Sequence, residues 1–328
     1  MTESTSSTLE GRRTLVTGGT GVVGGWLVHR LLDLQAEVIA LIRDEPAQAE
    51  IFRGGDIDRI SRVRGDLGDH HLLERVIGDY EVEVVFHLAA QSQVGSAELG
   101  PLETLESNVR GTYNVLEGAR RQAKPPAVVV ASSDKAYGAS TSLPYTEAHP
   151  LAGRGIYEAS KSAADLITTA YATSFGLPVA IARCGNIYGG GDLNWDRIVP
   201  GTIRALLGGE RPVLRSDGRP RRDYLYVQDA VTAYLRLAEG VLAGDVVGEA
   251  FNFGHNQPIS VIEIVDELRR ILGRKDLEPI IKGGASGEIP DQYLDASKAA
   301  TRLGWSPQFG LTAGLTETIA WYRDLLAR

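Results

Sequence analysis

The stretch Thr17-Gly18-Gly19-Thr20-Gly21-Val22-Val23-Gly24 decides the fold. It follows a short β-rich run over residues 13–17 and opens an apolar-periodic helix that we predict over residues 21–34. Glycines in a strand–turn–helix context allow a tight turn and a close approach of the backbone to a pyrophosphate, and the helix N-terminus supplies free N–H groups. The pattern predicts a dinucleotide site, against the alternative of a plain glycine turn. Its candidate residues are Gly18, Thr20, Gly21, Val22, Val23 and Gly24.

Strand-like and helical stretches alternate through the first half of the chain. Beyond the first run we predict strands over residues 37–42, 60–63, 82–87, 127–132 and 179–183, with a helix ending near residue 123. This alternation predicts an α/β fold with a Rossmann-type, doubly wound parallel sheet. Ligands in such sheets bind at the carboxyl ends of the strands.

The pattern loosens after Tyr188, which suggests a second, smaller α/β domain for substrate binding. We expect strands over residues 225–228 and 250–253 and helices near 260–272 and 311–326. The predicted organisation is a disordered tail (1–11), a dinucleotide-binding domain (12–188) with return segments near 224–253, and a mainly substrate-binding part (189–328).

Composition excludes several classes of protein. A net charge of −8 argues against a nucleic-acid partner, and no run of 18 apolar residues exists to span a membrane. We expect no signal peptide, because the N-terminal residues lack an apolar core. A single cysteine, Cys184, excludes an internal disulfide and suits the cytoplasm. The six histidines show no spacing that suits a metal, so no metal site is predicted.

Tyr157 and Lys161 are four residues apart, so on a helix they share one face. A free phenol has a pKa near ~10 and is a poor base at pH 7. A lysine ammonium one turn away favours the phenolate, so we expect a lowered tyrosine pKa and a base for a hydroxyl proton. The alternative is a surface tyrosine beside an unrelated lysine.

The end of the second predicted strand leaves the cofactor open between NAD and NADP. Arg43 suits a 2′-phosphate, while the neighbouring Asp44 keeps NAD possible. Asp66, followed by Leu67, is placed either to reach the adenine amine or to cap a helix that starts near Asp69. The small residues around Leu88, Ala89 and Ala90 leave room for a dinucleotide.

Taken together, the motifs resemble the extended short-chain dehydrogenase/reductase superfamily, over about residues 12 to 326. The resemblance rests on the glycine stretch, on Tyr157-x-x-x-Lys161, and on three further motifs: Arg183-x-x-Asn186-x-Tyr188-Gly189, Arg222-Asp223-Tyr224-x-Tyr226-Val227-x-Asp229 and Leu303-Gly304-Trp305-x-Pro307. It implies an enzyme that uses a nicotinamide cofactor on a nucleotide-diphosphate sugar. It also implies a homodimer formed through helices near 104–121 and 157–175.

The stretch Ser133-Asp134-Lys135 looks like that of the CDP-glucose 4,6-dehydratases within this family. So do Gly25-Trp26-Leu27 and Gly189-Gly190-Gly191-Asp192, whereas Arg43 looks more like the NADP-using GDP-mannose dehydratases. The resemblance implies conversion of a nucleotide hexose to its 4-keto-6-deoxy product by internal hydride transfer. A 4-epimerase is the alternative, followed by a reductase or a non-catalytic nucleotide-binding member.

Each candidate residue has an expected role in that reaction. Tyr157 takes the C4 hydroxyl proton, Lys161 holds the phenolate and the nicotinamide ribose, and Ser133 hydrogen-bonds the C4 oxygen, so Tyr157 and Lys161 are cofactor candidates as well. Asp134 is the acid for the departing C6 hydroxyl and Lys135 the base or polariser. Asn108 is a further cofactor candidate. The substrate-binding candidates are Gln91, Ser92, Asn186, Arg197, Arg222, Tyr224 and Gln292, of which Arg197 and Arg222 match a diphosphate.

Overall fold

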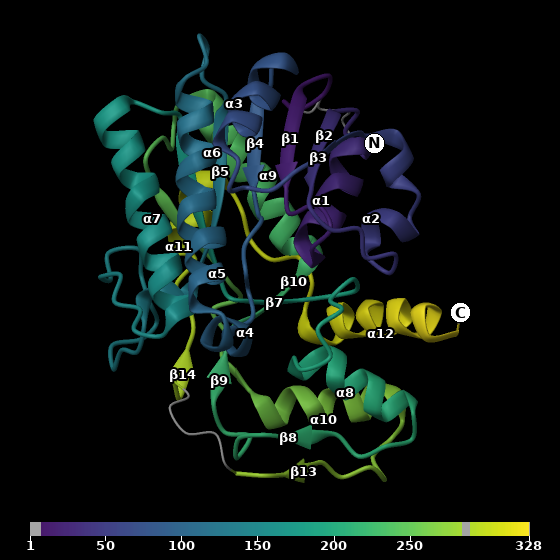
Figure 1. Cartoon of the computed structure of the whole chain (residues 1–328). Helices are drawn as coiled ribbons and strands as arrows, with labels where there is room; N and C mark the ends of the chain where they lie inside the picture. The colour runs from purple at the N-terminus through teal and green to yellow at the C-terminus, as the bar shows by residue number, and fades with distance from the viewer. Residues whose placement is uncertain (1–7, 284–288, 328) are drawn as a thin grey trace.

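A seven-stranded parallel sheet forms the centre of the computed structural model, which describes residues 8–283 and 289–327 (Figure 1). Its strand order is β11-β6-β5-β4-β1-β2-β3. The predicted α/β fold with a doubly wound sheet is therefore confirmed. The strands are β1 (Arg13–Thr17), β2 (Glu37–Ile42), β3 (Ser61–Arg64), β4 (Val84–His87), β5 (Ala127–Ser133), β6 (Val179–Cys184) and β11 (Ala250–Phe253).

The central strands are apolar along most of their length because helices cover both faces of the sheet. One layer contains α1 (Val22–Asp33) and α2 (Glu50–Arg53), on the right in Figure 1, together with α9 (Val227–Ala243). The opposite layer contains α3 (His70–Asp79), α6 (Gly111–Arg120) and α7 (Ile156–Phe175). The remaining elements of this half are η1 (Asp56–Arg59), α4 (Val94–Leu99), α5 (Pro101–Leu105), η2 (Glu106–Arg110), η3 (Asp134–Tyr137) and α11 (Ser297–Leu303).

A second core lies below the carboxyl ends of the sheet in Figure 1. It is formed by α8 (Ile198–Leu207), α10 (Val261–Leu272) and α12 (Leu311–Ala327), which bury side chains such as Ile203, Ile264 and Ile319. Three small sheets accompany these helices. Their strands are β7 (Asn186–Tyr188) with β10 (Tyr224–Tyr226), β9 (Arg221–Arg222) with β12 (Ile259–Ser260) and β14 (Asp291–Gln292), and β8 (Val213–Leu214) with β13 (Ile280–Ile281).

Two predicted elements differ from the structure. The strand expected over residues 225–228 ends at Tyr226, because only three residues of β10 pair with β7 and helix α9 starts at Val227. The single helix expected up to residue 123 is divided in two, since Gly100 and Pro101 end α4 and begin the next helix. That helix runs without interruption from α5 through the π-helical η2 into α6 and ends at Arg120.

The N-terminal segment is ordered earlier than predicted. Residues 1–7 of the expected tail lie outside the described residues. Leu9 is fully buried, and the Gly11 N–H donates to the Gln35 carbonyl, so residues 8–11 are anchored to the sheet although only Leu9 among them is buried. The boundary predicted after residue 188 stays a prediction. No helix within residues 8–283 and 289–327 is long and apolar enough to cross a membrane.

Candidate active site

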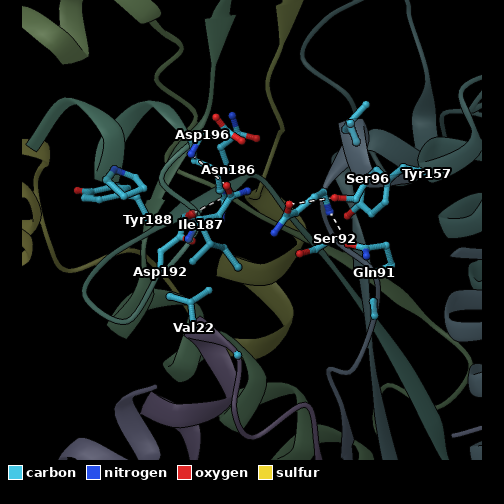
Figure 2. Close-up of a pocket in the computed structure, with 18 of the residues that line it drawn as sticks. Val22, Gln91, Ser92, Ser96, Tyr157, Asn186, Ile187, Tyr188, Asp192 and Asp196 are labelled. Atoms are coloured by element: carbon cyan, nitrogen blue, oxygen red, sulfur yellow. Dashed lines mark hydrogen bonds and ion pairs between the residues drawn. The ribbon is translucent and has the colours of Figure 1, made fainter. Parts of the chain in front are cut away.

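A large cleft opens at the carboxyl ends of the strands, between the sheet and the second core. Its volume is about 2210 Å³, whereas a pocket for one small ligand is typically about 300–1,000 Å³. Figure 2 shows Gln91, Ser92 and Tyr157 on one wall, with Asn186 and Asp192 on the other. The cleft is therefore large enough for a dinucleotide and a second nucleotide ligand together.

The glycine turn forms part of the cleft wall and presents the start of α1 to it. Gly18 has φ +77°, and a Cβ there would lie 2.6 Å from the Ala89 nitrogen. A Cβ on Gly24 would lie 2.1 Å from the Gly18 oxygen, so neither position admits a side chain. No side chain caps α1 at Gly21, which leaves the N–H groups of its first turn for an anion. This backbone cradle fits the pyrophosphate of a dinucleotide. Thr20, Gly21, Val22 and Val23 line the cleft as well.

Arg43 lies at the rim of the cleft and is already engaged by two carboxylates. Its Nε is 2.7 Å from Asp44 Oδ2, and its Nη1 is 3.8 Å from Asp66 Oδ2. The hydrogen bond to Asp44 raises the pKa of Arg43. Two acids around one guanidinium disfavour a further phosphate, so the geometry favours NAD where the residue type alone had suggested NADP. Leu67, Leu88, Ala89 and Ala90 line the cleft beside this region.

Asn108, a predicted cofactor residue, lies behind the cleft wall and not in it. Its amide accepts from the Gln91 N–H at 2.7 Å and donates to the Gln91 carbonyl at 3.0 Å. It also donates to the Ser160 hydroxyl at 2.9 Å. The predicted contact of Asn108 with the cofactor is therefore corrected: its side chain holds the Gln91 main chain against helix α7.

Tyr157 lines the cleft, while Lys161 lies deeper on the same face of α7. Lys161 Nζ donates to the Ala131 carbonyl at 2.8 Å, and burial lowers its pKa to about 8. Burial raises the pKa of Tyr157 to about 12, opposed by a hydrogen bond with Ser133. The expected lowering of the tyrosine pKa by Lys161 is therefore wrong for the free protein, because the phenol is buried and the ammonium is bound elsewhere.

Ser133 is the last residue of β5, and Asp134 and Lys135 begin η3, opposite Tyr157. Ser133 and Lys135 line the cleft, whereas Asp134 is 1% exposed and lies directly behind them. Burial raises the pKa of Asp134 to about 6, and its Oδ2 has no hydrogen-bond partner among the described residues. Near neutral pH, a larger fraction of Asp134 is therefore protonated than of an ordinary exposed aspartate.

The substrate-binding candidates divide into two groups. Those that line the cleft are Gln91, Ser92, Asn186, Arg197, Arg222 and Tyr224. Gln292 does not, since its side chain is fully buried and donates to the Asp134 carbonyl at 3.0 Å. Its position is a correction to the prediction, because the pairing of β14 with β9 turns Gln292 toward η3.

Asp192 is a cleft residue that the sequence did not single out as part of the site. Its Oδ2 accepts from Arg197 Nη1 at 2.8 Å, and its backbone carbonyl accepts from the Tyr322 hydroxyl at 2.6 Å. It therefore holds the candidate diphosphate-binding guanidinium in place. The available signal was its position directly after Gly189-Gly190-Gly191.

The family model of the NAD dependent epimerase/dehydratase family matches residues 14–254, which include the glycine turn, Ser133 to Lys135, Tyr157 and Lys161. The chain belongs to this family. The predicted resemblance is thereby confirmed, and membership of the NAD dependent epimerase/dehydratase family makes the chain an enzyme with NAD as its cofactor. The backbone cradle at Gly18 to Gly24 fits that cofactor.

Relatives within the family include sugar-nucleotide dehydratases of known sequence. The chain is 31% identical to a CDP-glucose 4,6-dehydratase of Salmonella typhimurium over 96% of this chain and 91% of that protein. It is 32% identical to a dTDP-glucose 4,6-dehydratase of Xanthomonas campestris over 94% and 92%.

Solved structures of the family include both dehydratases and epimerases. A dTDP-glucose 4,6-dehydratase of Streptomyces venezuelae with NAD bound has a TM-score of 0.86 at 31% identity, covering 95% of this chain and 97% of that one. A UDP-glucose 4-epimerase of Thermotoga maritima with UDP-glucose has the same TM-score at 27% identity, covering 96% and 99%. The fold is thus common to both reactions, and the site must distinguish them.

Proposed function

We propose that this enzyme is a nucleotide-sugar 4,6-dehydratase that most resembles the CDP-glucose 4,6-dehydratases. The observation that carries the proposal is the contact between Ser133 and Asp134. The buried Asp134 carboxyl, whose pKa is raised, accepts a hydrogen bond at 3.0 Å from the hydroxyl of Ser133, which lines the cleft. A 4-epimerase needs only Tyr157, Lys161 and the cofactor, whereas a dehydratase also needs an acid that can protonate a leaving hydroxyl. The 31% and 32% identities to dehydratases support the same choice.

The residues of the cleft have distinct parts in this reaction. NAD, when bound, supplies the hydride acceptor for C4 of the hexose and a positive ring charge that favours the phenolate. Tyr157 takes the proton of the C4 hydroxyl, and a hydrogen bond with Ser133 orients the Tyr157 phenol. Lys135 lines the cleft and removes the C5 proton that the new C4 ketone acidifies. Asp134 gives its proton to the departing C6 hydroxyl, which leaves as water. The hydride taken from C4 would then return to C6 and a proton to C5, so the 4-keto-6-deoxy sugar forms with no net use of NAD.

The substrate diphosphate belongs with Arg197 and Arg222, because guanidinium groups match phosphate oxygens. Both line the same part of the cleft as Asn186 and Tyr224. Arg197 is held by Asp192 and by the Ile187 carbonyl, and Arg222 by the Arg221 and Pro290 carbonyls. Such anchoring reduces the entropy lost when an arginine binds an anion.

The deciding experiment is mass spectrometry of CDP-, UDP-, dTDP-, GDP- and ADP-linked hexoses incubated with the protein and trace NAD. We expect a product lighter by one water from at least one of them. Asp134→Asn and Lys135→Ala should abolish that product while leaving NAD binding intact. An isomer of unchanged mass would replace the dehydratase by the epimerase.

We also propose a homodimer through α5, α6 and α7. Apolar side chains stand exposed on these helices, with Leu102 65% and Leu166 58% exposed. An unpartnered apolar surface of this kind favours association. Light scattering after size exclusion tests the mass, and Leu166→Glu should shift it to that of a monomer. A cytoplasmic location stays a prediction from the sequence.

A further inference from the structure

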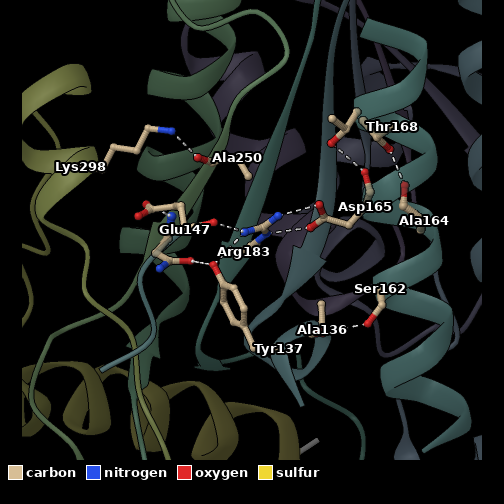
Figure 3. Close-up of polar contacts among 12 residues, drawn as sticks. Ala136, Tyr137, Glu147, Ser162, Ala164, Asp165, Thr168, Arg183, Ala250 and Lys298 are labelled. Carbon is tan, nitrogen blue, oxygen red and sulfur yellow. Dashed lines mark hydrogen bonds and ion pairs between the residues drawn. The ribbon is translucent and has the colours of Figure 1, made fainter. Parts of the chain in front are cut away.

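Arg183 forms a buried ion pair that the reaction described above does not use. It lies near the carboxyl end of β6, one residue before the cleft-lining Cys184. Its Nε and Nη2 each lie 2.8 Å from a carboxylate oxygen of Asp165 on helix α7 (Figure 3). The side chains of Arg183 and Asp165 are 7% and 1% exposed. A buried two-point pair fixes both position and orientation.

The same guanidinium also reaches the turn that contains the candidate acid. Arg183 Nη1 donates to the Tyr137 hydroxyl at 2.9 Å, and that hydroxyl donates to Asn252 Oδ1 at 2.7 Å. Tyr137 is the last residue of η3, which begins at Asp134. Arg183 therefore joins the two elements that carry the candidate catalytic side chains, η3 and α7. A second link between them runs from the Ser162 hydroxyl to the Ala136 carbonyl at 2.8 Å.

Asp165 lies one helical turn beyond Lys161, so both side chains share one face of α7. Other titratable groups that act on Lys161 or feel its charge are Cys184 on β6 and His87 on β4. The Asp165 carboxylate opposes the effect of burial on Lys161 and favours its charged form. The Lys161 ammonium is thus stabilised by two groups, the Ala131 carbonyl that it contacts and the Asp165 carboxylate on the same helix face.

We propose that Arg183 is a positioning residue. It binds Asp165 and thereby leaves Lys161 bound to the Ala131 carbonyl, on the same helix face as Tyr157. This inference rests on the proposed function, because it assumes that Lys161 and Tyr157 act together. Arg183 would set the charge state of a lysine through the carboxylate that lies between them.

The two partners have opposite effects on Lys161 in this arrangement. Without Arg183, the Asp165 carboxylate is a buried charge that has lost its guanidinium, and the cation on its own helix face that can compensate it is Lys161. Without the Asp165 carboxylate, Lys161 loses the anion that most supports its charge. A merely structural pair would instead change both variants in the same direction, through loosened packing.

The test is a titration of Lys161 in the free protein by NMR, with the lysine ε-carbons labelled. The chain has six lysines, and Lys161→Arg assigns the signal. The variants are Arg183→Gln, Asp165→Asn and the double variant. Arg269→Gln is the matched control, since Arg269 is likewise buried and paired with two acids but lies on α10, in the second core.

Expected results have opposite signs. The midpoint of Lys161, about 8 in the parent protein, should rise by about one pH unit in Arg183→Gln and fall by a similar amount in Asp165→Asn. The double variant should resemble Asp165→Asn, and Arg269→Gln should resemble the parent. If Arg183→Gln does not fold, Arg183→Lys replaces it, since a lysine keeps the charge but loses the two-point pair with Asp165 and should raise the midpoint in the same direction. An unmoved midpoint in Asp165→Asn, or shifts of the same sign in both single variants, overturns the proposal.

Failure of the proposed function is distinguishable from failure of this inference. The titration needs neither substrate nor turnover, so opposite shifts in a protein that dehydrates no sugar would leave the inference standing and remove the reaction. Normal turnover with an unmoved Lys161 midpoint would do the reverse.

Discussion

The Ser133 hydroxyl donates to Oδ1 of Asp134 at 3.0 Å, while the other oxygen of that carboxylate, Oδ2, is buried with no hydrogen-bond partner within residues 8–283 and 289–327. The single hydrogen bond does not offset burial, so the pKa of Asp134 rises from 3.8 to about 6. Ionising this group therefore costs the folded protein free energy that the unfolded chain does not lose.

The stability of the protein should reflect that difference. Because the folded pKa is raised, stability from protonated Asp134 is complete below about pH 4 and is lost as the pH rises through 6, by about 3 kcal/mol in all. Asp134→Asn cannot ionise, so its free energy of unfolding should gain on that of the parent across this window. Urea unfolding of both proteins from pH 4 to 7 measures the difference.

The pH dependence of the parent protein's stability does not by itself report on Asp134, because His87 contributes with the opposite sign. Burial lowers the pKa of His87 to about 3, so that group adds stability as the pH rises toward 6.5. Both proteins retain His87, and only their difference isolates Asp134. Parallel curves would show that Asp134 ionises normally.

Tyr157→Phe should lose turnover by about 10²–10⁴-fold, because the hydroxyl that handles the C4 proton is gone. The ring and its packing remain, so NAD affinity and thermal stability should change little. Calorimetric NAD binding beside the turnover assay separates the two. Turnover within a few-fold of the parent would remove Tyr157 from the chemistry.

The relative affinity for NAD and NADP should depend on Arg43 and on the carboxylate of Asp44 that binds it. Asp44→Asn removes the carboxylate at 2.7 Å, which frees the guanidinium for a 2′-phosphate and should raise NADP affinity about fivefold relative to NAD. Arg43→Ala should lower NADP affinity and leave NAD affinity nearly unchanged. Titration by fluorescence measures both ratios, and equal changes for both cofactors would contradict the assignment.

Gly18→Ala should destabilise the protein by about 3 kcal/mol and abolish NAD binding. The added methyl would meet the Ala89 backbone at 2.6 Å, in a conformation with φ +77°. Gly310→Ala is the control, since a Cβ there has nothing within 4 Å, needs no positive φ and lies away from the cleft. Melting temperatures and NAD binding of both variants decide the comparison.

Arg197→Ala should raise the KM for the nucleotide sugar by roughly ten- to a hundredfold, the effect of one lost charged hydrogen bond. Arg219→Ala serves as its counterpart, since the Arg219 side chain is 89% exposed. Similar KM values for Arg197→Ala and the parent would exclude Arg197 from diphosphate binding.

The sequence was sufficient for the sheet and its cofactor turn because these depend on local patterns. An apolar run such as Val128 to Val130 is typical of a strand buried on both faces, and the glycine spacing from Gly18 to Gly24 is typical of a dinucleotide-binding turn. The contacts of Asn108 and Gln292 could not be predicted, because each side chain is turned away from the cleft by a distant partner, Ser160 in one case and Asp134 in the other. The predicted lowering of the Tyr157 pKa was wrong for a related reason, since the desolvation that raises it depends on the complete fold.

The placement of β11 at the edge of the large sheet has a consequence for dissecting this protein. Residues 250–253 pair with β6 only after the chain has left the sheet, formed α8 and the small strands, and returned through α9. A cut before β11 removes a strand from the large sheet, and a cut after β11 separates α8 from α10 and α12 of the second core, so neither yields two self-contained fragments. A fragment ending near residue 188 would expose the edge of β6 to intermolecular pairing, and halves of this protein should be recoverable only by co-expression.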